Sequence, residues 1–219
     1  MPANDGSAPA PASVRDEVLR SIARGDLRPG SPLPVHVLAA RTSASPEDVV
    51  AALDELVEIG VARVAGGAVV VAETGPDKMA DADEVRHIIE EVAVRRFVRQ
   101  ATQSQINALG RALAEVERVA AEPEPSLEQL IRARDWFFVV LLRAGGLATR
   151  DLLRRLRSHA GLVMSLAVAG QGRPAELVEE LRAVHRALAA RDADAAVAAC
   201  DEHRRNSTVA GLRQLGATP

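Results

Sequence analysis

The 219-residue chain is poor in cysteine, lysine and aromatic residues. Cys200 is its single cysteine, which excludes an internal disulfide and agrees with a reducing compartment. Tyrosine is absent, and the aromatic side chains are Trp136 and three phenylalanines. A core of alanine, leucine and valine favours closely packed helices over a large sheet. No apolar run approaches the roughly 18 residues of a membrane span, so we expect no contact with a membrane and a cytoplasmic location.

The first twelve residues are rich in alanine and proline. They contain neither the basic segment nor the apolar segment of a signal peptide. Residues 1–12 are therefore predicted to be a disordered leader.

A first helix is predicted from Ser13 to just before Gly25. Ser13 has the spacing of a capping box with Asp16, whose carboxylate is expected to return a hydrogen bond to the first turn. Glycine is the residue that most often ends a helix. The apolar face of this helix consists of Val14, Val18, Leu19 and Ile22.

Two more helices and a hairpin are predicted to follow. The second helix covers about residues 34–41, and the third starts after an N-cap at Ser45 and stops at Gly60. Residues 61–65 and 68–72 are mostly apolar runs on either side of two glycines, which is typical of a β-hairpin. Residues 13–73 are thus predicted to form a winged helix-turn-helix.

The remainder shows helical patterns only. Residues 74–80 are predicted to be a linker, and 81–219 a second, all-helical domain. Proline or paired glycines separate its helices. Six helices with short connections are typical of an antiparallel bundle. The predicted helices cover residues 81–101, 104–121, 126–144, 148–169, 174–190 and 192–215.

Four sequence features together resemble the GntR family, specifically its FadR-like branch with an FCD effector domain. The resemblance covers about residues 13 to 215. It implies a winged helix-turn-helix that binds operator DNA as a homodimer. It also implies a helical domain in which a small metabolite changes the dimer geometry. The features are Gly25-Asp26-Leu27-Arg28-Pro29-Gly30, then Leu38-Ala39, then Ala52-Leu53 with Leu56 and Gly60, and the segment from Asp192 to His203.

The resemblance assigns DNA contacts to the third helix and to the wing. The family's recognition helix reads Ser-Arg-x-x-Val-Arg, whereas Pro46 and Val50 stand here in place of both arginines. Residues 1–73 contain six arginines and ten acids, although phosphate contacts need cations. The three arginines among the candidates are either phosphate contacts or solvated surface residues. The candidate DNA-binding residues are Arg28, Arg41, Ser45, Arg63, Gly66 and Gly67.

The resemblance also implies a metal site made of one aspartate and three histidines. Asp135 and His203 match two of these positions, but Val139 and Leu181 occupy the other two. A tight site for a borderline metal needs three or four ligands. We therefore expect no bound metal and no other cofactor.

The candidate ligand-binding residues come from the same resemblance and from histidine spacing. Arg86 either holds a carboxylate through two hydrogen bonds or forms a surface ion pair with Glu90. The histidines either reach the effector cavity or make ordinary helix contacts. Because two ligand positions are apolar, the expected effector is either a carboxylate or a larger apolar molecule. The candidates are Arg86, Asp135, His159, His185 and His203.

The sequence as a whole predicts a mainly α protein with a winged helix-turn-helix followed by an FCD-like bundle. Its predicted function is a ligand-responsive, DNA-binding transcription regulator with a metal-free cavity. One alternative is a repurposed member that has lost DNA binding and binds or transforms a small molecule. Asp135, His185 and His203 would then supply acid or base groups, but no catalytic constellation follows from their spacing, and none is assigned. Another alternative is a heteromeric partner of a DNA-binding paralogue.

Overall fold

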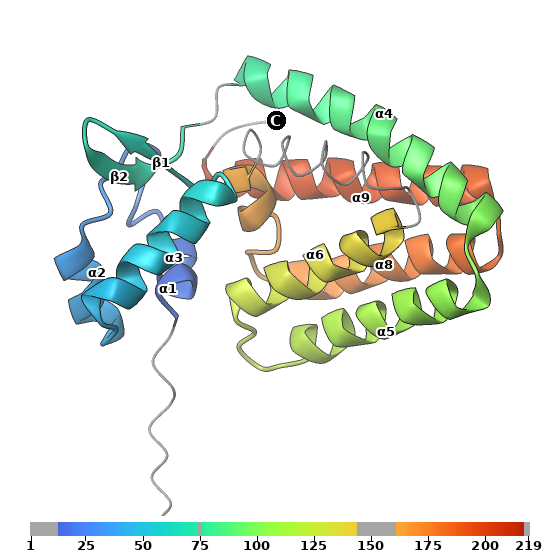
Figure 1. Ribbon diagram of the computed structural model, residues 1–219, viewed down its shortest axis with the longest axis horizontal. Helices are drawn as coiled ribbons and strands as arrows, with labels where there is room; N and C mark the ends of the chain where they lie inside the picture. Colours follow the sequence, from blue (N-terminus) through green and yellow to red (C-terminus); the bar gives the residue numbers. More distant parts are fainter. Residues whose placement is uncertain (1–12, 74–75, 144–160, 217–219) are drawn as a thin grey trace, which may run out of the picture.

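Helices make up nearly all of the regular structure in the computed structural model, which describes residues 13–73, 76–143 and 161–216 (Figure 1). A small head of three helices and a hairpin lies at one end of a longer helical bundle (Figure 1). A helical stretch over residues 161–166 precedes α8. The elements are α1 (Val14–Ala23), α2 (Val35–Thr42), α3 (Pro46–Glu58), β1 (Ala62–Ala65), β2 (Ala68–Val71), α4 (Pro76–Gln100), α5 (Gln103–Ala120), α6 (Leu127–Arg143), α8 (Arg173–Ala189) and α9 (Ala193–Gln214).

The head has the three helices that the sequence predicts. The Ser13 hydroxyl caps α1 by accepting a hydrogen bond from the Asp16 amide at 3.1 Å. Ser45 caps α3 in the same way, at 3.1 Å from the Asp48 amide, and Pro46 occupies the first helical position. These caps satisfy amides that have no partner within the helix, so each helix begins where its capping residue lies.

The wing is an antiparallel hairpin that runs from the pair Ala62 and Val71 to the pair Ala65 and Ala68. Its two turn glycines, Gly66 and Gly67, have φ angles of 57° and 79°. Two successive positive φ values define the hairpin turn that matches the twist of the flanking strands, and glycine adopts them without strain. With the three helices, the hairpin confirms the winged helix-turn-helix.

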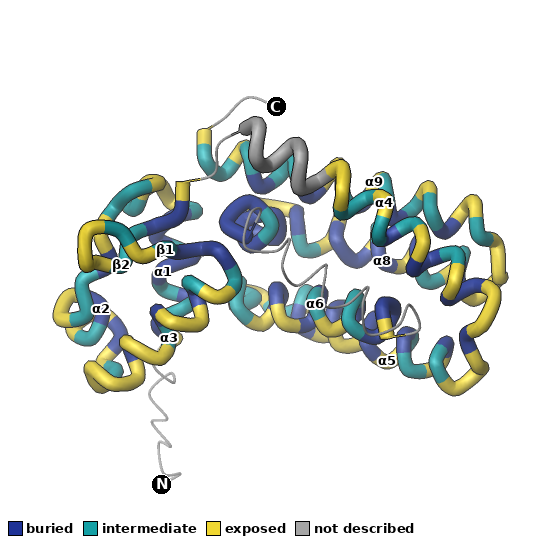
Figure 2. The backbone as a smooth tube through the Cα atoms, turned by 45° about the horizontal axis from the view of Figure 1, so that its top comes forward, coloured by how far each residue is buried: buried dark blue, intermediate teal, exposed yellow. Residues whose placement is uncertain are grey.

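The bundle packs α5, α6, α8 and α9 against one another, with α4 lying across α9 and α6. Buried segments of these helices face inward and exposed segments face outward (Figure 2). None of the described helices is long and apolar enough to cross a bilayer. Helix α4 begins at Pro76, so most of the predicted linker 74–80 is helical, because proline is favoured at a first helical position. The predicted helix over 148–169 lies largely outside the described residues.

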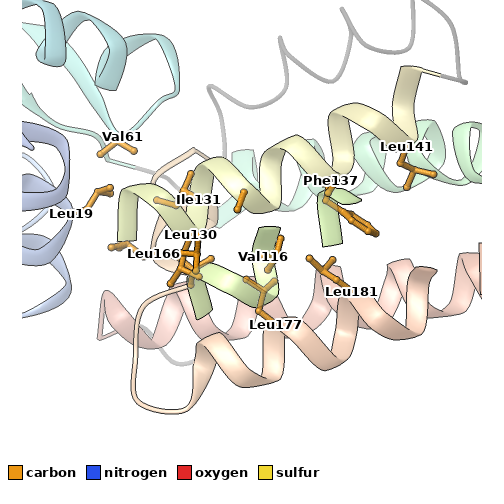
Figure 3. Packing of buried hydrophobic residues seen from close by; sticks show 14 of the residues in the cluster. Leu19, Val61, Val116, Leu130, Ile131, Phe137, Leu141, Leu166, Leu177 and Leu181 are labelled. Atoms are coloured by element: carbon orange, nitrogen blue, oxygen red, sulfur yellow. The ribbon is translucent and has the colours of Figure 1, made fainter. Parts of the chain in front are cut away.

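The head and the bundle share one hydrophobic core. Leu19 and Val61 of the head lie near Ile131 and Leu166 of the bundle, and all belong to a single cluster of buried residues (Figure 3). Gly161 touches the end of α3 closely, since a Cβ atom on it would lie 1.7 Å from the Ile59 carbonyl oxygen. The head is therefore packed against the bundle rather than tethered beside it.

Asp16 contacts the bundle as well as Arg20 of its own helix. Its Oδ1 accepts hydrogen bonds from the Ser126 hydroxyl at 2.9 Å and from the Glu128 amide at 3.1 Å. The predicted return bond to the first turn of α1 is thus wrong for this carboxylate. Its remaining oxygen pairs with Arg20 at 2.6 Å. Burial alone would raise the pKa of Asp16, but these hydrogen bonds outweigh burial and lower it. Asp16 therefore acts as a cap for α6, supplied from the head.

Candidate functional site: a buried polar cluster in the bundle

Arg173 and Glu180 form a buried ion pair on α8. They are seven residues apart, so two helical turns place them on the same face. The guanidinium donates from Nη1 to Oε1 at 2.7 Å and from Nη2 to Oε2 at 2.9 Å. Its Nε donates to the Ala167 carbonyl at 2.9 Å, which ties the pair to the chain just before α8. This two-pronged geometry fixes both side chains in one orientation.

His203 on α9 completes the cluster. Its Nδ1 lies 2.7 Å from Oε2 of Glu180, and its ring stacks on Phe138 of α6 with 5.2 Å between centroids. An ionised carboxylate only accepts hydrogen bonds, so Nδ1 carries the proton and Nε2 keeps its lone pair. The nearest hydroxyl, that of Ser207 one turn later, is 3.5 Å from Nε2. Three helices therefore meet at one imidazole.

The cluster keeps Glu180 ionised and His203 neutral. Burial alone would raise the pKa of Glu180, but hydrogen bonds from His203 and Arg173 and the nearby positive charge outweigh it and lower the pKa from 4.5 to about 2. Burial lowers the pKa of His203, and the charges of Arg134 and Arg173 lower it further, against the opposing effect of Glu180. At neutral pH, the charge that balances Glu180 is that of Arg173.

Asp135 and Arg134 lie on α6 and bind each other. The Arg134 guanidinium donates to Oδ1 of Asp135 at 2.9 Å and to the Met164 carbonyl at 2.6 Å. Arg134 is buried, so its charge is held by this carboxylate and this carbonyl. Asp135 thus belongs to an ion pair with Arg134, and His203 to the neighbouring cluster of Arg173 and Glu180.

These residues do not fit the metal site that the resemblance implies. Two of the four ligand positions are hydrocarbon, and Leu181 is fully buried in the core. Both remaining ligands have charged or polar partners, Arg134 for Asp135 and Glu180 for His203. Across residues 13–73, 76–143 and 161–216, no group of three or more potential ligand side chains could hold a metal ion. The donor set therefore supplies too few ligands for a tight site.

The described contacts of Arg86 and His185 lie elsewhere in the bundle. Arg86 pairs with Glu90 four residues later at 2.6 Å, as in the ion-pair alternative, but the pair is largely buried rather than on the surface. His185 lies between α8 and α5, where a Cβ on Gly110 would come within 3.3 Å of its Nε2. His159 lies outside the described residues. Among the four candidates that the structure describes, Asp135 and His203 lie in this region.

The candidate DNA-binding arginines differ in their partners. Arg41 forms an ion pair with Glu17, and Arg63 pairs with Glu73 at 2.7 Å. Arg28 is exposed in the turn before α2. Ser45 caps α3, and Gly66 and Gly67 form the wing turn. To bind a phosphate, Arg41 and Arg63 would each have to leave a carboxylate partner. Arg28 has no such partner among the described residues.

The outer face of α3 is acidic. No basic residue occurs between Pro46 and Glu58. A helix with this face repels phosphates rather than attracting them. The exposed residues of the helix are Pro46, Glu47, Asp48, Val50, Ala51, Asp54, Glu55 and Glu58.

No sequence motif predicts the centre of the cluster. Arg173 falls in a predicted break between helices, and Glu180 belongs to none of the candidate patterns. The available signals were the seven-residue spacing on α8 and the four-residue spacing of His203 and Ser207 on α9. Neither spacing reveals that α8 and α9 pack against each other at this point.

Residues 81–206 match the FCD domain family. The whole chain is similar in fold to E. coli McbR/YncC, with 22% identity, a TM-score of 0.64 and coverage of 92% of this chain and 96% of that one. It is also similar to a putative transcriptional regulator GntR from Rhodococcus sp. RHA1, with 20% identity, a TM-score of 0.61 and coverage of 94% and 97%. No curated protein matches the sequence. At these identities, the solved structures establish a shared fold.

Proposed function

Because the chain belongs to the FCD domain family of ligand-responsive transcription regulators, we propose that it binds operator DNA as a cytoplasmic homodimer and responds to an uncharged, largely apolar effector without a bound metal. The observation that carries this proposal is that one helix, α6, contacts both the DNA-binding head and the buried polar cluster.

Helix α6 is suited to transmit a displacement. Its first turn is held by Asp16 of the head, while Phe138, ten residues after Glu128, stacks on His203. Ten helical residues span about 15 Å, and a helix moves as a stiff rod over that length. Arg15 adds an ion pair to Glu128 at the same end. An effector that moves Phe138 would therefore move the head.

The arginine partners favour an uncharged effector over a carboxylate. The guanidinium groups of Arg86, Arg134 and Arg173 are each paired with a carboxylate of the chain. An anionic effector would have to displace one of these carboxylates, and breaking a buried pair leaves a charge uncompensated. Phe138 and the hydrocarbon side chains of Val139 and Leu181 favour an apolar molecule instead.

DNA binding in this proposal depends on few cations. Arg28 contacts phosphate directly, while Arg41 and Arg63 exchange Glu17 and Glu73 for phosphates. The Arg63–Glu73 pair is exposed and contributes only about 0–1 kcal/mol, so its exchange costs little. Glu17 is less exposed, but it keeps Arg24 and the Ser21 hydroxyl as partners when Arg41 leaves. With few phosphate contacts, the affinity depends on salt less steeply than that of an arginine-rich head.

A binding titration tests the DNA-binding part. Purified protein is titrated with DNA from upstream of its own gene and with unrelated DNA, at ~50 and ~200 mM salt. We expect tighter binding to the upstream DNA, and the Arg28→Ala variant should lower the slope of log affinity against log salt by about 1. Arg111→Ala, an exposed arginine of α5, serves as the control and should leave the slope unchanged. Equal binding of both DNAs would contradict the proposal.

A matched pair of small molecules tests the effector part. A medium-chain alcohol and the carboxylic acid with the same hydrocarbon chain are compared by their effect on the melting temperature. We expect stabilisation by the alcohol and loss of that stabilisation in Phe138→Ala. Stabilisation by the acid alone would refute the uncharged effector while leaving DNA binding to be judged by its own titration.

A further inference from the structure

The outer face of α4 carries an exposed apolar stripe. Val85, Ile88 and Val92 are 46%, 56% and 58% exposed, although the helix buries its opposite face in the core. With Arg95 and Arg99 they follow the alternating three- and four-residue spacing of a coiled-coil seam. Helix α4 lies along an outer edge of the bundle (Figure 1). The stripe is therefore not required for folding of the single chain.

The stripe is self-complementary about residue 90. Ile88 and Val92 lie two residues on either side of this midpoint. Glu84 lies six residues before it and Arg95 five residues after it, on the same flank of the stripe. When two such helices run antiparallel, residues on the same flank and at nearly equal distances from the midpoint lie close together. Ile88 then meets Val92, and Glu84 meets Arg95.

We propose that α4 pairs with α4 of a second copy in an antiparallel seam whose two-fold axis passes near residue 90. Ile88 of each copy packs against Val92 of the other, and Val85 packs against the aliphatic part of the opposing Arg96. Glu84 of each copy pairs with the opposing Arg95, which releases Asp194, an exposed partner in the single chain. The seam rests on the homodimer of the proposed function and identifies the surface that forms it.

A second copy fits this face better than an unrelated partner. An isologous interface brings the same patch of both copies together, so the patch must complement itself under two-fold rotation. Ile88 with Val92, and Glu84 with Arg95, meet this condition. The other exposed apolar side chains, such as Trp136 on α6 and Val64 on β1, lack this spacing.

The mass in solution tests the seam. We expect a wild-type mass of twice 23.2 kDa by light scattering after size exclusion. Ile88→Asp should weaken the dimer at least about 100-fold, because each seam then buries two unpaired carboxylates. Trp136→Asp, an equally exposed residue of another helix, is the matched control and should remain dimeric. Melting curves establish that both variants are folded.

Charge reversal and cross-linking test the register. Glu84→Arg alone should weaken the dimer, and adding Arg95→Glu should restore it. In a Cys200→Ala background, cysteines at positions 88 and 92 should form a disulfide-linked dimer, whereas cysteines at 85 and 88 should not. A dimer that survives Ile88→Asp, or cross-linking by the second pair alone, would overturn the seam.

The outcomes separate the seam from the proposed function. If the protein prefers the upstream DNA and the Ile88→Asp variant is still a dimer, the seam is refuted but the proposed function stands. A dimer that Ile88→Asp dissociates, but that binds both DNAs equally, supports the seam and contradicts the function.

Discussion

Replacing Glu180 by glutamine removes the charge that balances the buried Arg173 while keeping the shape of the side chain. A fall in the pKa of Glu180 from 4.5 to about 2 corresponds to about 3 kcal/mol of stabilisation of the ionised carboxylate. Its side chain is only 11% exposed, so solvent screens the pair little. We therefore expect Glu180→Gln to lower the free energy of unfolding by about 3 kcal/mol, within the range for breaking a buried pair.

The same guanidinium provides a matched control. Glu176 also contacts Nη1 of Arg173, at 3.3 Å, but its side chain is 68% exposed. Glu176→Gln should cost at most about 0.5 kcal/mol, because exposed pairs contribute little. Both free energies are measured by urea unfolding at pH 7. A cost for Glu180→Gln no larger than that of Glu176→Gln would refute the buried ion pair.

The stabilisation by Glu180 should depend on pH in a definite direction. The folded pKa of Glu180 lies below its ordinary value, so its stabilisation is complete well above pH 4.5 and is lost as the pH falls toward about 2. The difference between the wild type and Glu180→Gln should shrink by about 1 kcal/mol between pH 7 and pH 4. A difference that grows on acidification would contradict the assignment.

Three further results are expected. Gly161→Ala places a Cβ 1.7 Å from the Ile59 carbonyl oxygen and should cost at least about 2 kcal/mol in urea unfolding. Gly110→Ala meets only the end of the His185 ring and should cost less; equal costs would contradict the close contact. Burial raises the pKa of Cys200, so a thiol reagent should label the folded protein at least about 100-fold more slowly than the urea-unfolded protein. Neither Zn²⁺ nor a chelator should shift the melting temperature by more than about 1 °C, and a rise of several degrees with Zn²⁺ would refute the incomplete ligand set.

Local residue patterns were sufficient for the helix starts and the wing turn of the head. Ser13 and Ser45 mark helix starts through bonds that close within three residues, and Gly66-Gly67 marks the wing turn. Such interactions depend on chain neighbours alone, so they can be read from the sequence. The boundary at Pro76 was harder, because proline begins helices as well as interrupting them.

The candidate site was predictable only in part. Asp135 and His203 came from the resemblance, and the paired state of Arg86 was one of its stated alternatives. The position of His185 between α8 and α5 depends on which face of α8 its neighbours cover, and spacing within one helix does not determine this.

The sequence by itself determined that a winged helix-turn-helix precedes an FCD bundle, and where the capped helices α1 and α3 of the head begin. Only the tertiary structure decided which side chains meet. Asp16 could cap either its own helix or another helix, and because the head packs on α6, it caps α6. Glu180 and His203 are 23 residues apart and meet because α8 and α9 pack side by side. The physical reason is that a buried charge takes the partner that packing brings within reach, and packing is a property of the whole chain.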